Sequence, residues 1–286
     1  MPSLIDIRRR IRSVKNTQQI TKAMKMVSAA KLRRAQDRAI AARPYGAMLE
    51  QILVNVAEAA AQNPEGDGQP LLAVRPEKRI LLIVVTADRG LAGGFNSNLL
   101  RVAQRFADEH HTDELSFELI GRKGRDYFRR RSRSIHGEHV DLFRVVRFED
   151  AEKIADAVID LFSKAEIDAV YLFGNEFKSM MASNLSSKRL LPIEVPKSST
   201  PVDYIYEQKP EELLGTLLPR YVKIQIFRAL LESAAAEHAA RMTAMDAATS
   251  NASDVIDRLT LYMNRVRQAS ITREIIEIVS GAAALD

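Results

Sequence analysis

The sequence predicts an α/β domain inserted into a long α-helical scaffold, in which an N-terminal and a C-terminal helix pair as an antiparallel coiled coil. Residues 3–43 and 220–280 contain no glycine or proline. Between these two segments, apolar runs alternate with amphipathic ones, which favours a sheet covered by helices. We therefore divide the chain into an N-terminal helix at 1–62, an α/β domain at 77–205 and a C-terminal helix at 210–286.

Apolar side chains of the first helix are predicted to lie on one narrow face. They recur at intervals of three and four residues, which is typical of an amphipathic helix. A polar interruption separates two rows of such residues. The rows are Leu4, Ile7, Ile11 and Val14, then Ile20, Met24 and Val27. The helix is expected to bend near Pro44 and Gly46 and to continue until the loop at 63–70.

In the central segment, residues 79–86 (RILLIVVT) read as a fully buried strand, because six consecutive residues are apolar and mostly β-branched or leucine. A glycine-containing turn at 88–96 and a helix at 97–109 follow. This order favours a parallel or mixed sheet. The other strands are predicted at 116–121, 143–148 and 168–174, and the other helices at 122–131 and 149–166.

The C-terminal helix is predicted to be too long for one small domain, because 61 residues at about 1.5 Å each make a rod of roughly 90 Å. Its apolar and small residues follow a heptad pattern that requires a facing helix. The N-terminal helix is the economical partner. Small and polar members indicate a close but weak pairing that other proteins are expected to complete. The seam consists of Met242, Met245, Thr249, Ala252, Ile256, Leu259, Met263 and Val266.

Charge is distributed unevenly along the chain. Residues 1–43 hold twelve Lys and Arg against two Asp, whereas residues 210–286 hold eight Lys and Arg against ten Asp and Glu, within a net charge of +5. A basic end suggests an acidic partner, which could be nucleic acid, a lipid headgroup or an acidic protein surface. The chain has no cysteine, so it forms no disulfide or thiolate metal site. No apolar run reaches the length that spans a bilayer.

The sharpest enzymatic hypothesis is a nucleotide site at the strand, turn and helix of residues 86–98. A helix N-terminus with small residues can hold phosphate. However, Gly90, Gly93 and Gly94 do not make the G-x-G-x-x-G spacing, and no Lys-Ser/Thr pair follows as a P-loop requires. A structural turn with positive φ angles is the preferred interpretation.

Other candidate sites have simpler structural interpretations. The histidines at 110–111 and the cluster at 136–139 suggest metal ligands, but we expect solvated connections there, because no further ligand stands at a diagnostic spacing. Glu274 and Glu277 share a helical face, yet we expect interface charges rather than paired acid and base. The basic run at 122–133 lacks a nucleic-acid motif, so a solvated or protein-binding face is preferred. No catalytic residue, cofactor or metal site is therefore predicted.

Four segments together resemble the γ subunit of the F-type ATP synthase, in the same order and across nearly the whole chain. They are NTQQITKAMKMVSAAKLRRAQ at 16–36, TADRGLAGGFN at 86–96, EHAARMTAMDAATSNA at 237–252 and RQASITREIIEIVSGAAAL at 267–285. The resemblance implies a coiled coil that carries a Rossmann-like domain without a bound nucleotide.

This resemblance also implies a mechanical function. The chain would be the rotor shaft that couples rotation of a proton-driven c-ring to ATP chemistry at the β subunits. Its expected partners are the α and β subunits, the ε subunit and the c-ring, with no nucleic acid and only an indirect link to the membrane. In the absence of a transit peptide, we expect a peripheral protein on the cytoplasmic face of a bacterial membrane.

Site residues are implied by matching this sequence to the family motifs. The apolar end of the C-terminal helix would turn inside a sleeve formed by the α and β subunits, and the residues of this bearing are Ile275, Ile276, Ile278, Val279 and Leu285. The residues expected to contact β are Met24, Lys25, Arg241, Gln268, Thr272, Glu274 and Glu277. Departures from the family pattern occur at Ala92, Lys25 and Arg273, where relatives often have cysteine, glutamate and glutamine.

Overall fold

The computed structural model describes residues 3–62, 69–110, 114–179, 183–195 and 208–283. Two helices dominate the chain, α1 (Leu4–Gln62) and α5 (Pro210–Ala283). The chain divides into two compact units, each containing part of both helices. The first unit consists of Met1–Ser28 with Met242–Asp286, and the second consists of Ala29–Arg241.

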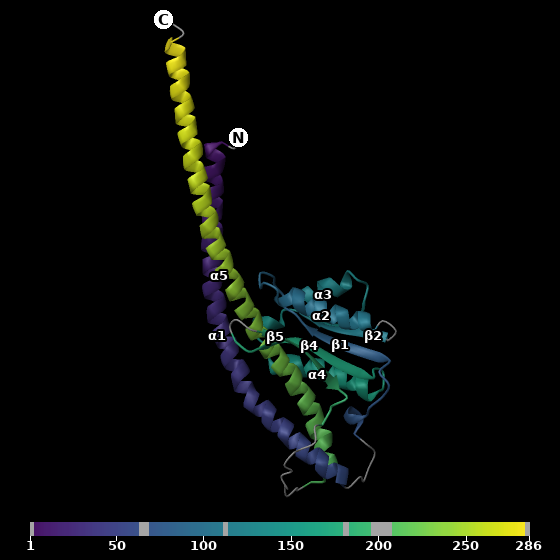
Figure 1. Ribbon diagram of the computed structural model, residues 1–286. Coiled ribbons are helices and arrows are strands. Elements are labelled where there is room, and N and C mark those ends of the chain that lie inside the picture. Colours follow the sequence, from purple (N-terminus) through teal and green to yellow (C-terminus); the bar gives the residue numbers. More distant parts are fainter. Residues whose placement is uncertain (1–2, 63–68, 111–113, 180–182, 196–207, 284–286) are drawn as a thin grey trace. The chain divides into compact units, whose positions relative to one another are not determined.

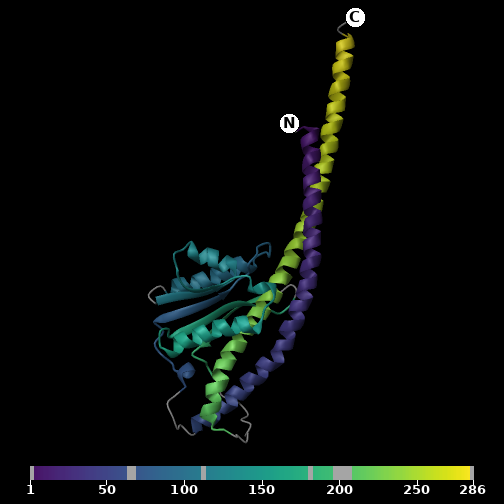
Figure 2. The same ribbon diagram turned by 180° about the vertical axis from the view of Figure 1, so that it is seen from behind.

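In the first unit, the N-terminal part of α1 and the C-terminal part of α5 lie side by side and antiparallel (Figures 1 and 2). The predicted seam of α5 is confirmed, because all eight of its residues are buried or half-buried. At its centre, the hydroxyls of Thr21 and Thr249 are 2.7 Å apart. Met245 and Ala252 are buried on the α5 side, and Ile7 on the α1 side. The contact around Thr21 and Thr249 is therefore close and includes small side chains, while larger apolar residues occupy the rest of the seam.

The predicted second apolar row of α1 is wrong at two of its three residues, because only Met24 is half-buried. Ile20 and Val27 are 60% and 56% exposed, while their neighbours Thr21 and Ser28 are buried in the seam. The heptad spacing that starts at Leu4 continues without interruption through these small polar residues. Small hydroxyl side chains allow two helix backbones to approach closely, so size rather than hydrophobicity determines which residues occupy this part of the seam.

The second unit contains a five-stranded mixed sheet in the order β3-β2-β1-β4-β5. Four strands are parallel, and β5 is antiparallel to β4. The central strand pairs with β2 and β4 through the same residues, with Ile83 opposite Glu118 on one side and Leu172 on the other. The strands are β1 (Arg79–Val85), β2 (Glu114–Ile120), β3 (Ser134–His139), β4 (Ala169–Phe177) and β5 (Ser183–Leu191).

Helices cover both faces of this sheet, as Figure 2 shows. One face of β1, with Ile80, Leu82 and Val84, packs under α2 (Phe95–Glu109) and α3 (Arg122–Arg129). The other face packs against α4 (Phe148–Ser163) and against the parts of α1 and α5 that belong to this unit. Because both faces are covered, the strand can be apolar throughout, which explains why the prediction of a fully buried strand is confirmed.

Two parts of the predicted sheet are wrong. Residues 143–148 are not a strand: a short 3-10 helix, η2 (Leu142–Arg144), lies there, and α4 begins at Phe148. Val146 is instead buried in the core beside α4. The strand beside β2 is β3, whose sequence SIHGEH has the polar character of an edge, and the strand at the other edge, β5, was not predicted. A further 3-10 turn, η1 (Pro70–Leu72), precedes the sheet.

Candidate functional site

The last turns of α5 carry an unusual concentration of exposed apolar side chains. They are between 49% and 71% exposed, although isoleucine and valine are normally among the most buried residues. With 3.6 residues per turn, these side chains fall within an arc of about 160° on one side of the helix. The members of this apolar face are Ile271, Ile275, Ile276, Ile278 and Val279. Leu285, which was predicted to belong with them, lies outside the described residues.

The opposite side of the same turns is charged. Arg273, Glu274 and Glu277 fall within an arc of about 100° facing away from the apolar face. The two polar residues predicted nearby, Gln268 and Thr272, lie on the apolar side, and the Thr272 hydroxyl donates to the Gln268 carbonyl at 3.0 Å. The end of α5 is therefore amphipathic and presents different chemistry in different directions.

Met24 and Lys25 lie on α1 in the same unit, at a different level of the coiled coil. Lys25 donates to Asp246 of α5 in an ion pair whose side chains are 41% and 60% exposed. Asp246 precedes Gln268 by about six helical turns. Met24 and Lys25 therefore do not form a single local site with the predicted residues at the end of α5. The lysine that departs from the family pattern thus has an acidic partner in the facing helix.

Arg241 belongs to the second unit and is already engaged there. Its side chain is only 12% exposed, and Nη2 donates to Glu237 Oε1 at 2.6 Å and to the Gly90 carbonyl at 3.1 Å. Burial raises the pKa of Glu237, although the charge of Arg241 opposes that change. Burial, with the charges of Arg241 and Lys31, lowers the pKa of the adjacent His238 to about 4.

Side chains from the first turn of α2 contact the glycine turn that precedes this helix. Asn96 Oδ1 accepts a hydrogen bond from the Ala87 amide at 2.9 Å, and Asn98 packs so close to Gly94 that an added Cβ would be 2.7 Å from Nδ2. Positive φ angles occur at Leu91 and Gly93, 61° and 53°. The positive φ angles and these side-chain contacts match the structural turn that was preferred.

The interpretation of residues 136–139 as a solvated connection is wrong. His136 and His139 lie on β3, and both hydrogen-bond the buried carboxylate of Glu118 on β2, at 3.0 Å and 2.5 Å. A Cβ at Gly137 would be 2.2 Å from that carboxylate, so glycine leaves room for it. Burial raises the pKa of Glu118, but the hydrogen bonds from the two histidines outweigh this effect and lower it overall. These polar residues form a structural cluster at the sheet edge.

Within the described ranges, no group of three or more His, Cys, Asp or Glu side chains has an arrangement suited to a metal ion. Over the same ranges, no helix is both long enough and apolar enough to cross a bilayer. His110 ends α2, where its ring stacks on Phe106 with centroids 4.1 Å apart, while His111 lies outside the described residues. The exposed apolar face of α5 is therefore the strongest candidate site among those predicted.

Comparison with known proteins agrees with the motif resemblance. A family model described as ATP synthase matches residues 3–285. The chain is 64% identical over 286 residues to the ATP synthase gamma chain of Solibacter usitatus and 51% identical over 289 residues to that of Pelotomaculum thermopropionicum, with all of this chain and all of each relative covered.

Solved structures with a similar fold come from mitochondrial ATP synthases. A chain in the central stalk and c-ring structure from Tetrahymena thermophila is 26% identical, with a TM-score of 0.63, covering 80% of this chain and 99% of that one. A chain in the Euglena gracilis structure of OSCP, F1 and c-ring is 17% identical, with a TM-score of 0.66. The match covers 99% of this chain and 94% of that one. These matches support neither a nucleotide-dependent enzyme nor a nucleic-acid module.

Proposed function

The chain belongs to the ATP synthase γ-chain family, and from this premise we propose how its exposed surfaces perform that family's task. It is the non-catalytic central shaft of the F1 sector and couples proton-driven rotation of the c-ring to ATP synthesis and hydrolysis at the β subunits. Its partners are the α and β subunits, the ε subunit and the c-ring, and it is a peripheral membrane-associated subunit.

The observation that carries the proposal is the apolar face of α5. Five isoleucine and valine side chains in successive turns are exposed in the chain by itself, and exposed apolar patches of this kind mark sites that partners cover. Burial of each such side chain is worth about 1.5–3 kcal/mol. We place Ile275, Ile276, Ile278 and Val279, followed by Leu285, within the sleeve of the surrounding α and β subunits as the bearing surface.

Coupling depends on the asymmetry of the shaft. A rotor can shift an equilibrium among three β subunits only if it contacts their states differently. The end of α5 meets this requirement, because the side opposite its apolar face carries charge. Glu274 and Glu277 would contact β from the charged side of the helix. Gln268 and Thr272 would contact β from its apolar side.

Two further contacts lie elsewhere in the chain. Met24 and Lys25 would face an acidic part of β, where the basic N-terminal helix finds complementary charge. Lys25 would then share its ammonium group between Asp246 and β. For Arg241, a carboxylate of β must compete with Glu237, because Arg241 is paired and nearly buried in the free chain.

The remaining details are also proposals. We divide the chain into a shaft helix at 1–62, a Rossmann-like domain at 77–205 and a second shaft helix at 210–286, and we place the protein at the cytoplasmic face of a bacterial membrane. We further propose that the chain has no active site of its own. The turn at 86–98 supports this, since Asn96 at the start of α2 is engaged by the Ala87 amide and the glycine spacing is not that of a nucleotide-binding loop.

Charging the bearing surface tests the proposal. In reconstituted vesicles, Ile275→Glu with Ile276→Glu should abolish assembly or strongly reduce proton-coupled ATP synthesis, because two carboxylates cannot be buried in an apolar sleeve without partners. Val74→Glu with Val145→Glu is the matched control, since these side chains are 80% and 56% exposed on the second unit. Removal of residues 281–286 should have a milder effect.

Unchanged ATP synthesis by the Ile275 and Ile276 variant would contradict the bearing assignment. An equal loss in the control variant would show that added negative charge, rather than the position on α5, causes the defect. The isolated chain should show no ATPase activity. When it is purified from cells together with its partners, it should copurify with the α, β and ε subunits.

A further inference from the structure

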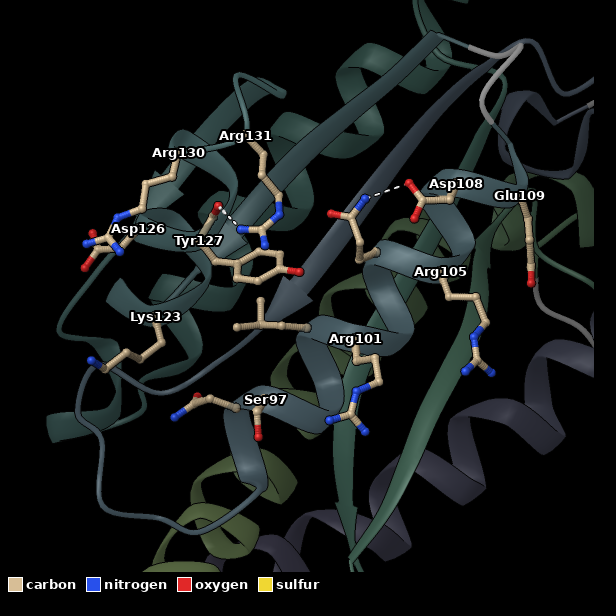
Figure 3. Close-up of a pocket in the computed structure, with 13 residues that line it drawn as sticks. Ser97, Arg101, Arg105, Asp108, Glu109, Lys123, Asp126, Tyr127, Arg130 and Arg131 are labelled. Atoms are coloured by element: carbon tan, nitrogen blue, oxygen red, sulfur yellow. Dashed lines mark hydrogen bonds between the residues drawn. The ribbon is translucent and has the colours of Figure 1, made fainter.

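A basic groove lies between α2 and α3, on the outer side of the helices that cover one face of the sheet (Figure 3). It has a volume of about 870 Å³. Helices form both of its walls, so the backbone positions from which its side chains extend are fixed. Its lining comprises Asn96, Ser97, Leu100, Arg101, Gln104, Arg105, Asp108 and Glu109 of α2, and Lys123, Asp126, Tyr127, Arg130 and Arg131 of the α3 region.

The carboxylates of the groove are mostly neutralised by arginines outside its lining. Arg133 pairs with Asp108 at 3.2 Å, and Arg125 pairs with Asp126 at 2.9 Å. Gln104 also donates to Asp108 at 2.7 Å. Two of the three acidic groups are therefore compensated before any ligand arrives.

The cations of the groove have no such compensation. Within the described part of the chain, no carboxylate pairs with Arg101 or Arg105 on α2, or with Lys123 or Arg130 on the facing wall. Arg101 and Arg105 are four residues apart and share a helical face, an arrangement in which like charges destabilise a helix. An anion placed between the two walls would relieve this repulsion.

The α3 side of the groove presents a fifth cation, which is held by contacts within that wall (Figure 3). The Arg131 guanidinium lies 3.6 Å from the Tyr127 ring centroid and donates to the Tyr127 carbonyl at 3.2 Å. These two contacts orient the guanidinium before a ligand binds, which reduces the entropy lost on binding. Guanidinium groups suit phosphate particularly well, because their planar donors match its oxygens in bidentate geometry.

We propose that this groove binds a small molecule carrying adjacent phosphoryl groups. Its volume lies within the range of about 300–1,000 Å³ that is usual for small-molecule sites. Apart from Leu100 and Tyr127, the lining is polar or charged, whereas the core of a protein interface is depleted of charge. The site is distinct from the shaft contacts, since all of its residues come from α2 and the α3 region, and it does not depend on the proposed function of α5.

Two sources provide this chemistry, inorganic polyphosphate and a nucleoside polyphosphate. At the end of the groove nearest the start of α2, the Ser97 hydroxyl donates to the Gly94 carbonyl and keeps its oxygen as an acceptor for a sugar hydroxyl or a base, while the cations require only the phosphoryl groups. Tripolyphosphate and ATP carry the same number of phosphoryl groups, so their affinities can be compared directly. Equal affinities identify the phosphoryl chain as the ligand, and tighter binding of ATP adds recognition of the nucleoside; both results support the site.

The experiment is calorimetric titration of the full chain with tripolyphosphate and with ATP, at constant ionic strength. We expect saturable binding at one site and a higher thermal midpoint in the presence of ligand. Arg101→Gln with Arg105→Gln should weaken binding at least tenfold. Lys123→Gln with Arg130→Gln, on the other wall, should have a comparable effect and provides a second test if the first variant folds poorly.

The matched control is Arg144→Gln with Arg147→Gln, which removes the same charge from exposed positions outside the groove. Its affinity should remain within about twofold of the parent chain. Absence of saturable heat, or an equal loss in the control, would overturn the proposal. So would binding of hexaglutamate peptide in place of tripolyphosphate with the same dependence on Arg101 and Arg105, because the groove would then accept a polypeptide.

Discussion

Two segments of this chain have nearly the same apolar residues and opposite environments. The strand β1 reads RILLIVV, and the last turns of α5 read REIIEIV. Ile80 and Ile83 are completely buried in the strand, while Ile275 and Ile278 are 55% and 71% exposed on the helix. Hydrophobicity alone therefore does not decide which residues the chain buries by itself.

The difference arises from what surrounds each segment. Helices cover both faces of β1, so each of its side chains meets neighbours from the same chain. On the last turns of α5, from Ile271 onward, no side chain is buried or half-buried within the described residues. The second unit thus completes its own core, whereas the apolar side chains at the end of α5 find no cover within the described residues.

The largest expected effect comes from making the same substitution in both regions. Ile83→Ala should destabilise the free chain by about 2–5 kcal/mol, because it leaves a cavity in a closed core. Ile278→Ala should change the stability of the free chain by less than about 0.5 kcal/mol, since its side chain is exposed. Denaturant unfolding of the two variants measures both values. Similar losses would mean that the tip is packed within the free chain.

In the assembled complex, this comparison should change for Ile278 and stay the same for Ile83. Partner subunits that cover the apolar face would make Ile278→Ala costly, because a side chain buried by a partner loses its contacts when truncated. Thermal dissociation of the reconstituted complex reports this. A complex of unaltered stability would remove Ile278 from the proposed bearing surface.

A second, smaller effect depends on pH and concerns the self-contained unit. The pKa of His238 is lowered to about 4 from an ordinary value of 6.5. Since the unfolded chain then takes up the proton first, the stability due to neutral His238 is complete above pH 6.5 and is lost progressively as pH falls towards 4. The loss amounts to about 3 kcal/mol at most.

His238→Gln tests this dependence, because glutamine is polar and does not titrate. The variant should lose less stability than the parent chain between pH 6.5 and 4, as measured by denaturant unfolding at several pH values. The Nδ1 atom of His238 is buried without a hydrogen-bond partner among the described residues, so the glutamine amide should not break an existing contact. Parallel stability curves would show that the pKa of His238 is not lowered in the folded chain.

The sequence predicts those elements whose burial depends on hydrophobicity, and it misses those whose burial depends on contacts with distant residues. Apolar continuity predicted β1, and heptad spacing predicted the α5 side of the seam. The α1 side was missed at Thr21 and Ser28, because their burial depends on how closely two backbones approach, which hydrophobicity does not encode. The edge strand β3 was missed for a related reason: its polar residues His136 and His139 are satisfied by Glu118 from a neighbouring strand.

The candidate site shows a similar limit. Family motifs supplied the residues of the α5 tip, but its division into an apolar and a charged side follows from helical geometry and was not predicted. The sequence indicated one wall of the groove, because the basic run at 122–133 was identified. The cations of the other wall, Arg101 and Arg105, were not identified. They belong to a different helix, and only the packing of α2 beside α3 brings the two sets together.

A third prediction concerns the hydroxyl pair at the centre of the seam. Replacing either Thr21 or Thr249 with valine should cost about 1 kcal/mol, because the remaining hydroxyl loses its 2.7 Å partner. Replacing both should cost less than the sum of the two single changes, since the contact between the two hydroxyls can be lost only once. A double-mutant cycle by denaturant unfolding measures the coupling. Additive losses would indicate that each hydroxyl is satisfied by its own helix, through the carbonyls of Gln18 and Met245.

The smallest expected effect is that of the ion pair between Lys25 and Asp246. Both side chains are substantially exposed, so water and salt screen their attraction, and the coupling should be only about 0.2–1 kcal/mol in the free chain. A double-mutant cycle with Lys25→Ala and Asp246→Ala measures it, and the value should fall as salt concentration rises. Exchanging the charges, with Lys25→Asp and Asp246→Lys, should restore most of the coupling in the free chain.

If Lys25 also meets an acidic part of β, the exchanged variant should still impair ATP synthesis, because a carboxylate on α1 in place of the ammonium group would repel that surface. Full recovery of both stability and synthesis would confine Lys25 to the seam, and a coupling of several kcal/mol would mean that the seam, like the sheet, is held by contacts shielded from water.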